Sequence, residues 1–158
     1  HNKFINKNSN IKIFKLNLDK NIMLLKKKLK KFNNFRIYYF ATTKIELNTT
    51  SKNKISEYEN FYIKYPIKIL KIFKDKKIKF FYPSTVYVDN NNSYYAKIKK
   101  KAEKILFKYA NNSTFINILR LDEINTRQNL SLMERKLPNF LNILANNKVY
   151  KKKLFFIN

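Results

Sequence analysis

KIKFFYPSTVYV, at residues 77–88, is followed by SYYAKIKKKAEKILFKYA at residues 93–110 and FINILRL at residues 115–121. The first and last of these segments contain short apolar runs of the kind that form buried strands. The segment between them repeats apolar residues at helical spacing. We expect the first strand to end near Tyr82. Two strands joined by a helix of this length run parallel, which indicates an α/β fold.

The rest of the chain continues this alternation of strands and helices. Strand patterns occupy residues 11–18 and 35–41, and helix patterns occupy residues 21–32 and 56–74. A polar loop is expected at residues 42–54, and a short apolar tail at residues 154–157 predicts another strand. Pro66 lies inside the second helix pattern and predicts a kink or a later helix start, because proline has no amide donor. We expect an α/β domain whose parallel sheet is flanked by helices.

The composition excludes several classes of site. The chain has 158 residues, no Cys and one His, at position 1. Disulfides, zinc thiolate sites, cysteine nucleophiles and His-based metal sites are therefore excluded, and we expect no metal. No apolar run reaches the roughly 18 residues of a membrane span, and the N-terminus lacks the apolar core of a signal peptide. We expect a cytoplasmic protein with no membrane partner.

The net charge of +25 has two interpretations. It is typical of proteins that bind nucleic acid by neutralising phosphates. However, Lys, Asn, Ile, Phe and Tyr are abundant while Gly, Cys and Trp are absent, which is what drift toward A and T in a coding sequence produces. Because the lysines are spread along the whole chain, we favour biased coding and do not expect a nucleic-acid partner.

A candidate site follows the strand within residues 77–88. Ligands bind open parallel sheets at the carboxyl ends of the strands, and Ser84 and Thr85 lie there. Tyr95 and Lys99 come next, four residues apart and hence on one helix face. A nearby ammonium favours phenolate, which predicts a lowered pKa for Tyr95 and a role as general acid or base. Spacing alone equally allows a tyrosine packed on the sheet and a solvated lysine.

Seven segments, taken in order, carry a family resemblance. They are FKLNLD at 14–19, RIYYFAT at 36–42, EYEN at 57–60, KIKFFYPSTVYV at 77–88, YAKIKKKAEKIL at 95–106, INILRL at 116–121 and LPNFLNIL at 137–144. Together they resemble the extended short-chain dehydrogenase/reductase family, specifically its NAD-dependent epimerase/dehydratase group of sugar-nucleotide enzymes. The resemblance covers nearly the whole chain and implies a Rossmann-like parallel sheet.

The resemblance implies a Ser-Tyr-Lys catalytic site. Tyr95 would be the proton donor and acceptor, and Lys99 would lower its pKa while holding ribose hydroxyls of the cofactor, so both residues would also bind the cofactor. Ser84 would hydrogen-bond the reacting sugar oxygen, with Thr85 as the substitute candidate.

The implied cofactor is NAD or NADP, and the implied substrate is a nucleotide-linked sugar. Phe40, Ala41 and Thr42 would contact the cofactor through backbone and small side chains. Asn60 would lie near the nicotinamide half, and Asn17 would face the adenine. A homodimer is possible, and the sequence does not decide the oligomeric state.

Several positions depart from the family pattern. No Gly-rich strand–turn–helix precedes residue 11, and the chain has no Gly. We therefore expect a single partial NAD(P)-binding domain over residues 1–158 that is N-terminally truncated and lacks the first βαβ unit, with the substrate-binding part starting at about residues 122–158. Asn17 stands where Asp is usual, Ala96 where Gly follows the tyrosine, and Glu123 where several relatives bind substrate through Asn.

Two functions remain open at this stage. The first is an NAD(P)-dependent epimerase, dehydratase or reductase acting on a nucleotide-linked sugar, although this piece alone is expected to be inactive. The second is a catalytically inactive, dehydrogenase-like scaffold subunit of a larger assembly that contains RNA, which the charge and the lost glycines favour.

Overall fold

The computed structural model describes residues 17–46, 49–89 and 92–122, together with the backbone of a strand at residues 154–157. These residues form one sheet in the order β1-β2-β3-β4. The strands are β1 (Asn34–Tyr38), β2 (Lys77–Thr85), β3 (Thr114–Leu121) and β4 (Leu154–Ile157). β2 pairs in parallel with β1 and β3, whereas β4 is antiparallel to β3.

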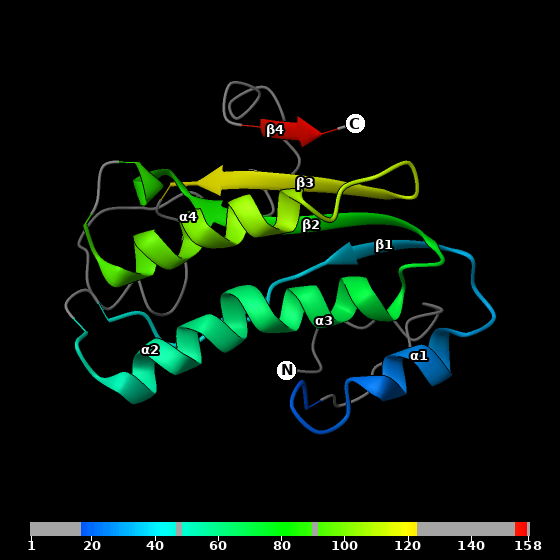
Figure 1. Cartoon of the computed structure of the whole chain (residues 1–158), viewed down its shortest axis with the longest axis horizontal. Helices are drawn as coiled ribbons and strands as arrows, with labels where there is room; N and C mark the ends of the chain where they lie inside the picture. The colour runs from blue at the N-terminus through cyan, green and yellow to red at the C-terminus, as the bar shows by residue number, and fades with distance from the viewer. Residues whose placement is uncertain (1–16, 47–48, 90–91, 123–153, 158) are drawn as a thin grey trace, which may run out of the picture.

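Helices pack against one face of this sheet (Figure 1). A continuous helical run consists of α2 (Lys52–Glu59), the π-helical turn η1 (Asn60–Lys64) and α3 (Tyr65–Ile72). α4 (Tyr94–Phe107) lies beside this run and crosses over β2 and β3. The short helix α1 (Met23–Leu29) and the 3-10 turn η2 (Val86–Val88) complete the described helices. The protein is therefore a mixed α/β structure with three parallel strands.

The core lies between the sheet and the helices. Side chains alternate between the two faces of a strand, so Ile78, Phe80 and Tyr82 of β2 point toward the helical layer, where they are almost fully buried. Tyr58 and Tyr62 reach the same core from the helical run. Burial of this much apolar and aromatic surface is the main force that joins the layers.

Most of the predicted elements are confirmed, with shifted ends. The patterns at 35–41 and 115–121 correspond to β1 and β3, and the tail corresponds to β4. The pattern at 93–110 forms α4, which Ser93 caps by accepting a hydrogen bond from the amide of Ala96 at 3.2 Å. The pattern at 21–32 yields only the seven residues of α1.

Other expectations change or fall outside the description. Residues 11–16 of the expected first strand and the segment at 137–144 that resembles the family lie outside the described residues, and Leu18 is in a turn. The expected start of the second helix at residue 56 is wrong, because α2 begins at Lys52 within the segment expected to be a loop.

The expected end of β2 near Tyr82 is also wrong, because β2 continues to Thr85. β3 runs parallel to it as far as the pair Thr85–Leu121 and supplies hydrogen-bond partners. On the other side, β1 has already ended at Tyr38, the partner of Phe81. Pro83 is tolerated in the strand because β1 does not extend beside it to require an amide donor.

Pro66 does shape the helical run, as its missing donor predicts. The run widens to a π-helical turn just before Pro66, where the amide of Tyr65 bonds the carbonyl of Asn60. Pro66 cannot donate to the carbonyls of Phe61 and Tyr62, five and four residues earlier. Tyrosine hydroxyls replace the missing amide: Tyr39 donates to Phe61 O at 2.6 Å and Tyr82 donates to Tyr62 O at 3.1 Å.

We predict that Tyr82→Phe lowers the free energy of unfolding by about 1–3 kcal/mol, because the carbonyl of Tyr62 is then buried without a donor. In a Pro66→Ala background the new amide can supply that hydrogen bond, so the same substitution costs less. Chemical denaturation of the four proteins of this cycle measures the difference. Tyr38→Phe, at an exposed tyrosine of β1, is the control and should be nearly neutral. Equal costs in both backgrounds would refute the replacement of the amide by the hydroxyl.

Candidate active site

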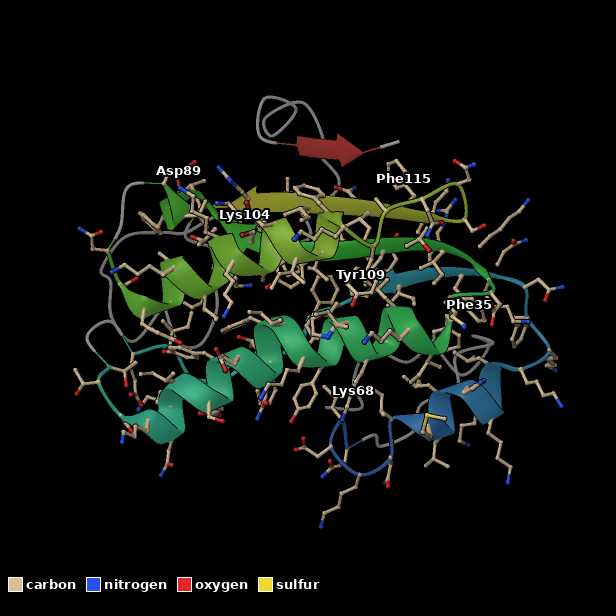
Figure 2. All side chains as sticks on the ribbon, viewed as in Figure 1. Phe35, Lys68, Asp89, Lys104, Tyr109 and Phe115 are labelled. Atoms are coloured by element: carbon tan, nitrogen blue, oxygen red, sulfur yellow. The ribbon has the colours of Figure 1, made fainter. Side chains whose placement is uncertain are left out.

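The structure brings Ser84, Tyr95 and Lys99 to the carboxyl edge of the parallel strands. Ser84 lies at the end of β2, and Tyr95 and Lys99 lie on the first two turns of α4. Ser84 follows Tyr82 on the helix-facing side of β2, because alternate residues share a face. Asp89, which follows η2, marks the same edge (Figure 2).

Lys99 is the most enclosed of the three. Only 5% of the residue is exposed, and its ammonium donates a hydrogen bond to the carbonyl of Pro83 at 2.7 Å. Aromatic rings surround Nζ, with centroids at 4.3, 4.6 and 5.8 Å for Tyr62, Tyr82 and Tyr95. Ring faces attract a cation, so the three tyrosines and the carbonyl together solvate the ammonium in place of water.

The Pro83 carbonyl is available because β1 has ended. Odd-numbered residues of β2 bond toward β1, as the bonds of Lys77 N to Asn33 O and of Tyr39 N to Phe81 O show, both near 3.0 Å. By the same alternation Pro83 faces the β1 side, two residues beyond the partner of Tyr38. The helix therefore supplies through Lys99 the donor that a longer β1 would have supplied.

Burial has a large effect on the charge of Lys99. It lowers the pKa to about 7 from the ordinary 10.5, and the carboxylate of Glu103, one turn later on α4, counteracts part of this effect. Desolvation disfavours the charged form of a lysine. Lys99 is therefore not the solvated lysine that the spacing allowed, and it is the group in this cluster whose charge changes near neutral pH.

The expected lowering of the pKa of Tyr95 is wrong. Burial raises the pKa of its phenol, and the neighbouring hydroxyls of Tyr62 and Tyr58 raise it further. Its ring packs edge-on against those of Tyr62 and Tyr58, with centroids 5.5 and 6.1 Å away. Because desolvation is the largest effect, Tyr95 remains a protonated, neutral phenol at neutral pH and is a weaker acid than an exposed tyrosine.

Ser84 has a buried hydroxyl at this edge that the described residues leave without a hydrogen bond. The residue is 5% exposed, and its hydroxyl has no hydrogen-bond partner among the described residues. Buried hydroxyls normally have one. The substitute candidate, Thr85, points to the opposite face of the sheet, and its hydroxyl accepts a bond from the amide of Tyr87 at 3.3 Å as the cap of η2. Ser84 is thus the hydroxyl that faces the helical layer.

Of the three residues expected to contact the cofactor after β1, Thr42 is joined to the cluster. Its hydroxyl lies 2.8 Å from the hydroxyl of Tyr62, whose ring covers Lys99. Ala41 packs half-buried against the core. Phe40 stacks on Tyr38 and contacts Phe81 on the other face of the sheet, so the structure does not bring it to Lys99.

The segment around Thr42 is held against α2 by further hydrogen bonds. Thr43 donates to the carboxylate of Glu57, and Lys54 bonds both of these residues at 3.0 and 2.8 Å. These contacts lower the pKa of Glu57, chiefly through Lys54. The hydroxyl of Tyr58 accepts a bond from the amide of Glu46 at 2.6 Å. The segment after β1 is thereby fixed along the helix that carries Tyr58 and Tyr62.

The two asparagines expected to bind cofactor have structural roles in the described residues. The side chain of Asn17 accepts bonds from the amides of Asp19 and Lys20 at 2.9 and 3.1 Å, which stabilises the turn before α1. Asn60 contributes its carbonyl to the π-helical turn. Within the described part of the chain, no hydrogen bond joins either side chain to Ser84, Tyr95 or Lys99.

An ion network fixes α4 to the sheet. Arg120 of β3 donates to both carboxylate oxygens of the buried Glu103, with the closest contact at 2.7 Å, and to Asp89 at 2.5 Å. Asp89 also pairs with Lys100 at 3.1 Å. Lys100 and then Arg120 lower the pKa of Asp89, while Glu103 raises that of Arg120. The network holds the helix that presents Lys99 in register with β2 and β3.

Sequence reasoning missed Tyr62, Tyr82 and Pro83, which form the surroundings of Lys99. One signal was present: Pro66 leaves carbonyls that need donors, and tyrosines are abundant nearby. Pro83 gave no comparable signal, because its role depends on where β1 ends.

Three further features of the described residues limit what the site can be. Within the described residues, no group of three or more His, Asp or Glu side chains could hold a metal ion. Of the helices described, none combines the length and the apolar character needed to cross a membrane. A hollow of about 580 Å³ lies at the amino ends of the strands, between residues such as Asn34, Lys77 and Ser113. It is at the sheet edge opposite Ser84, so the volume of that hollow does not bear on this site.

Comparison with known proteins adds no assignment: no protein-family model and no curated protein sequence matches the chain. What the arrangement can do chemically therefore rests on its groups. A buried hydroxyl can orient a substrate oxygen, a neutral phenol can donate a proton, and a lysine with a pKa of about 7 can change charge beside them.

We predict that the stability of the protein rises with pH between about 7 and 9 because of Lys99. The unfolded chain holds the proton of this lysine up to its ordinary pKa of 10.5, whereas the folded chain releases it near 7. The unfolded state thus binds more protons in this window, which increases stability by up to roughly 1.4 kcal/mol per pH unit. Urea denaturation at several pH values should show this rise in the natural chain and not in Lys99→Met.

The control is Lys97→Met, which removes an exposed lysine from the same helix and should leave the rise unchanged. Loss of the rise in both variants would assign it to net charge instead of to the buried ammonium.

Proposed function

We propose that the chain is part of a Rossmann-like, NAD(P)-dependent enzyme of the epimerase/dehydratase type that acts on a nucleotide-linked sugar in the cytoplasm. The observation that carries the proposal is the buried hydroxyl of Ser84, which has no hydrogen-bond partner among the described residues. Ser84 lies at the carboxyl edge of parallel strands, next to the Pro83 carbonyl that Lys99 bonds. Ligands of open α/β sheets bind at that edge, and a buried hydroxyl without a partner favours a ligand that supplies one.

The polar groups of this edge fit the nicotinamide half of a dinucleotide and a sugar oxygen. Lys99 makes one hydrogen bond to the described residues, to Pro83, of the three that an ammonium can donate. Thr42 brings a hydroxyl to the same cluster through Tyr62. These side chains would hold the ribose and the reacting oxygen. When bound, the nicotinamide supplies the chemistry of taking and returning a hydride.

Each residue has a defined task in this proposal. Ser84 donates a hydrogen bond to the reacting sugar oxygen and fixes its position. Tyr95, a neutral phenol, donates its proton to that oxygen when a carbonyl is reduced and recovers it when a hydroxyl is oxidised. Lys99 sets how readily the phenol gives up its proton, since a charged ammonium favours phenolate and a neutral amine does not. Tyr62, Tyr82 and Tyr95 exclude water from Lys99.

We predict that Tyr95→Phe reduces turnover of the nucleotide-linked sugar by about 10²–10⁴-fold, the usual contribution of a positioned acid or base. Binding of NADH or NADPH, followed by nicotinamide fluorescence, should persist because the ring remains. The matched control is Tyr94→Phe, which removes the hydroxyl of the adjacent tyrosine, a ring stacked on Tyr58. Undiminished turnover by the Tyr95→Phe variant would contradict the proposed function.

A further inference from the structure

The sheet face opposite α3 and α4 carries cations beside exposed aromatic rings. The register places Arg36 next to Lys79, and Lys79 next to Phe115, on this face. Figure 2 shows Phe115 on the side of β3 away from α3, whereas Phe35 lies between β1 and α3. We define the basic–aromatic face as Arg36, Tyr38, Phe40, Lys77, Lys79, Phe81 and Phe115.

Two rings of this face form an accessible platform. Tyr38 is 54% and Phe40 49% exposed, and their rings stack with centroids 6.2 Å apart and planes at 23°. The buried ring of Phe81 lies beneath them, 5.8 Å from each. Singly exposed apolar residues are common, but neighbouring exposed apolar groups that form a continuous patch often mark a binding surface. Exposed aromatic rings on a firm support can stack with unpaired bases.

The cations of the face lie next to the platform, and no acidic side chain accompanies them in the part of the hollow that the structure describes. Arg36, Lys77 and Lys79 line the hollow of about 580 Å³ together with asparagines, a serine and Phe115, and its lining contains no Asp or Glu. The sequences of β1, β2 and β3 likewise contain no acidic residue. The field over this face is therefore positive, in a chain that already carries a net charge of +25.

We propose that the basic–aromatic face binds single-stranded nucleic acid, with bases stacked on Tyr38 and Phe40 and phosphates held by Arg36, Lys77 and Lys79. Positive charge alone would suit any polyanion, but open ring faces add recognition only for bases that are not paired. The lysines that the sequence spreads along the chain gave no reason to expect this surface. It is the sheet register that places them together.

This binding surface does not depend on the proposed enzymatic function. The hollow lies at the amino ends of the strands, and Ser84 and Lys99 lie at the carboxyl ends on the other face. Single-stranded nucleic acid bound to the basic–aromatic face would therefore not cover the candidate active site. Failure of one proposal leaves the other standing.

The test is fluorescence anisotropy of a labelled oligouridylate of about 15 nucleotides, a length that covers one such site, with the full chain. We expect Tyr38→Ala and Phe40→Ala each to raise Kd by about tenfold, because each removes a stacking ring. Phe32→Ala is the matched control, since Phe32 is 47% exposed but lies outside this face. Tyr38→Leu keeps an apolar side chain without the ring and should behave like Tyr38→Ala.

Two double variants with the same change in net charge test the location of the cations. Arg36→Gln with Lys79→Gln should raise Kd by at least about tenfold and reduce the slope of log K against log salt by about 2. Lys97→Gln with Lys104→Gln, two exposed lysines of α4, should have a much smaller effect. Unlabelled oligouridylate should compete better than duplex RNA of the same length.

Three outcomes would overturn the proposal. They are absence of binding at low salt, equal losses from the two double variants, and Kd values for Tyr38→Ala and Tyr38→Leu that match that of the natural chain. Circular dichroism of each variant establishes that it is folded, which is expected because the substituted side chains are exposed.

Discussion

The hydrogen bond from the Lys99 ammonium to the carbonyl of Pro83 joins the two layers of this protein at its carboxyl edge. It exists because β2 extends beyond the end of β1 and leaves the carbonyl of Pro83 where β1 does not reach it. It also requires that a cation be taken out of water, which costs free energy unless other groups replace the water. The rings of Tyr62 and Tyr82 do so, and they come from η1 and β2, so one interaction fixes the relative positions of three elements.

Tyrosine hydroxyls also satisfy backbone carbonyls of the helical run in the same region. Pro66 interrupts the helical run and frees two carbonyls, and the hydroxyls of Tyr39 and Tyr82 replace its missing amide. Tyr82 thus acts twice, with its hydroxyl on the helix and its ring under Lys99. A chain with no glycine has less access to positive φ, and none of the described residues adopts one. Here, the hydroxyls of tyrosine side chains donate the hydrogen bonds that the backbone carbonyls need.

Periodicity predicted much of the fold. The apolar runs at β1 and β3 and the helical spacing of α4 are local patterns, and burial of their apolar faces is enough to place them. The length of β2 could not be predicted from the sequence. Pro83 is acceptable in this strand only because the neighbouring strand, β1, ends before it. The position of Ser84, Tyr95 and Lys99 at one edge followed from strand-end and helix-start signals. Their electrostatics did not follow, since the pKa of Tyr95 and Lys99 depends on burial by residues distant in sequence.

The most direct test of this account is the pKa of Lys99, measured by NMR titration of lysine Cε resonances with the signal assigned through its absence in Lys99→Arg. The account predicts one lysine that titrates near pH 7, because its ammonium is enclosed by Pro83 and three tyrosine rings. If Lys99 instead titrates near its ordinary value of 10.5, the ammonium is in water. The contact that joins α4 to the end of β2 would then not exist.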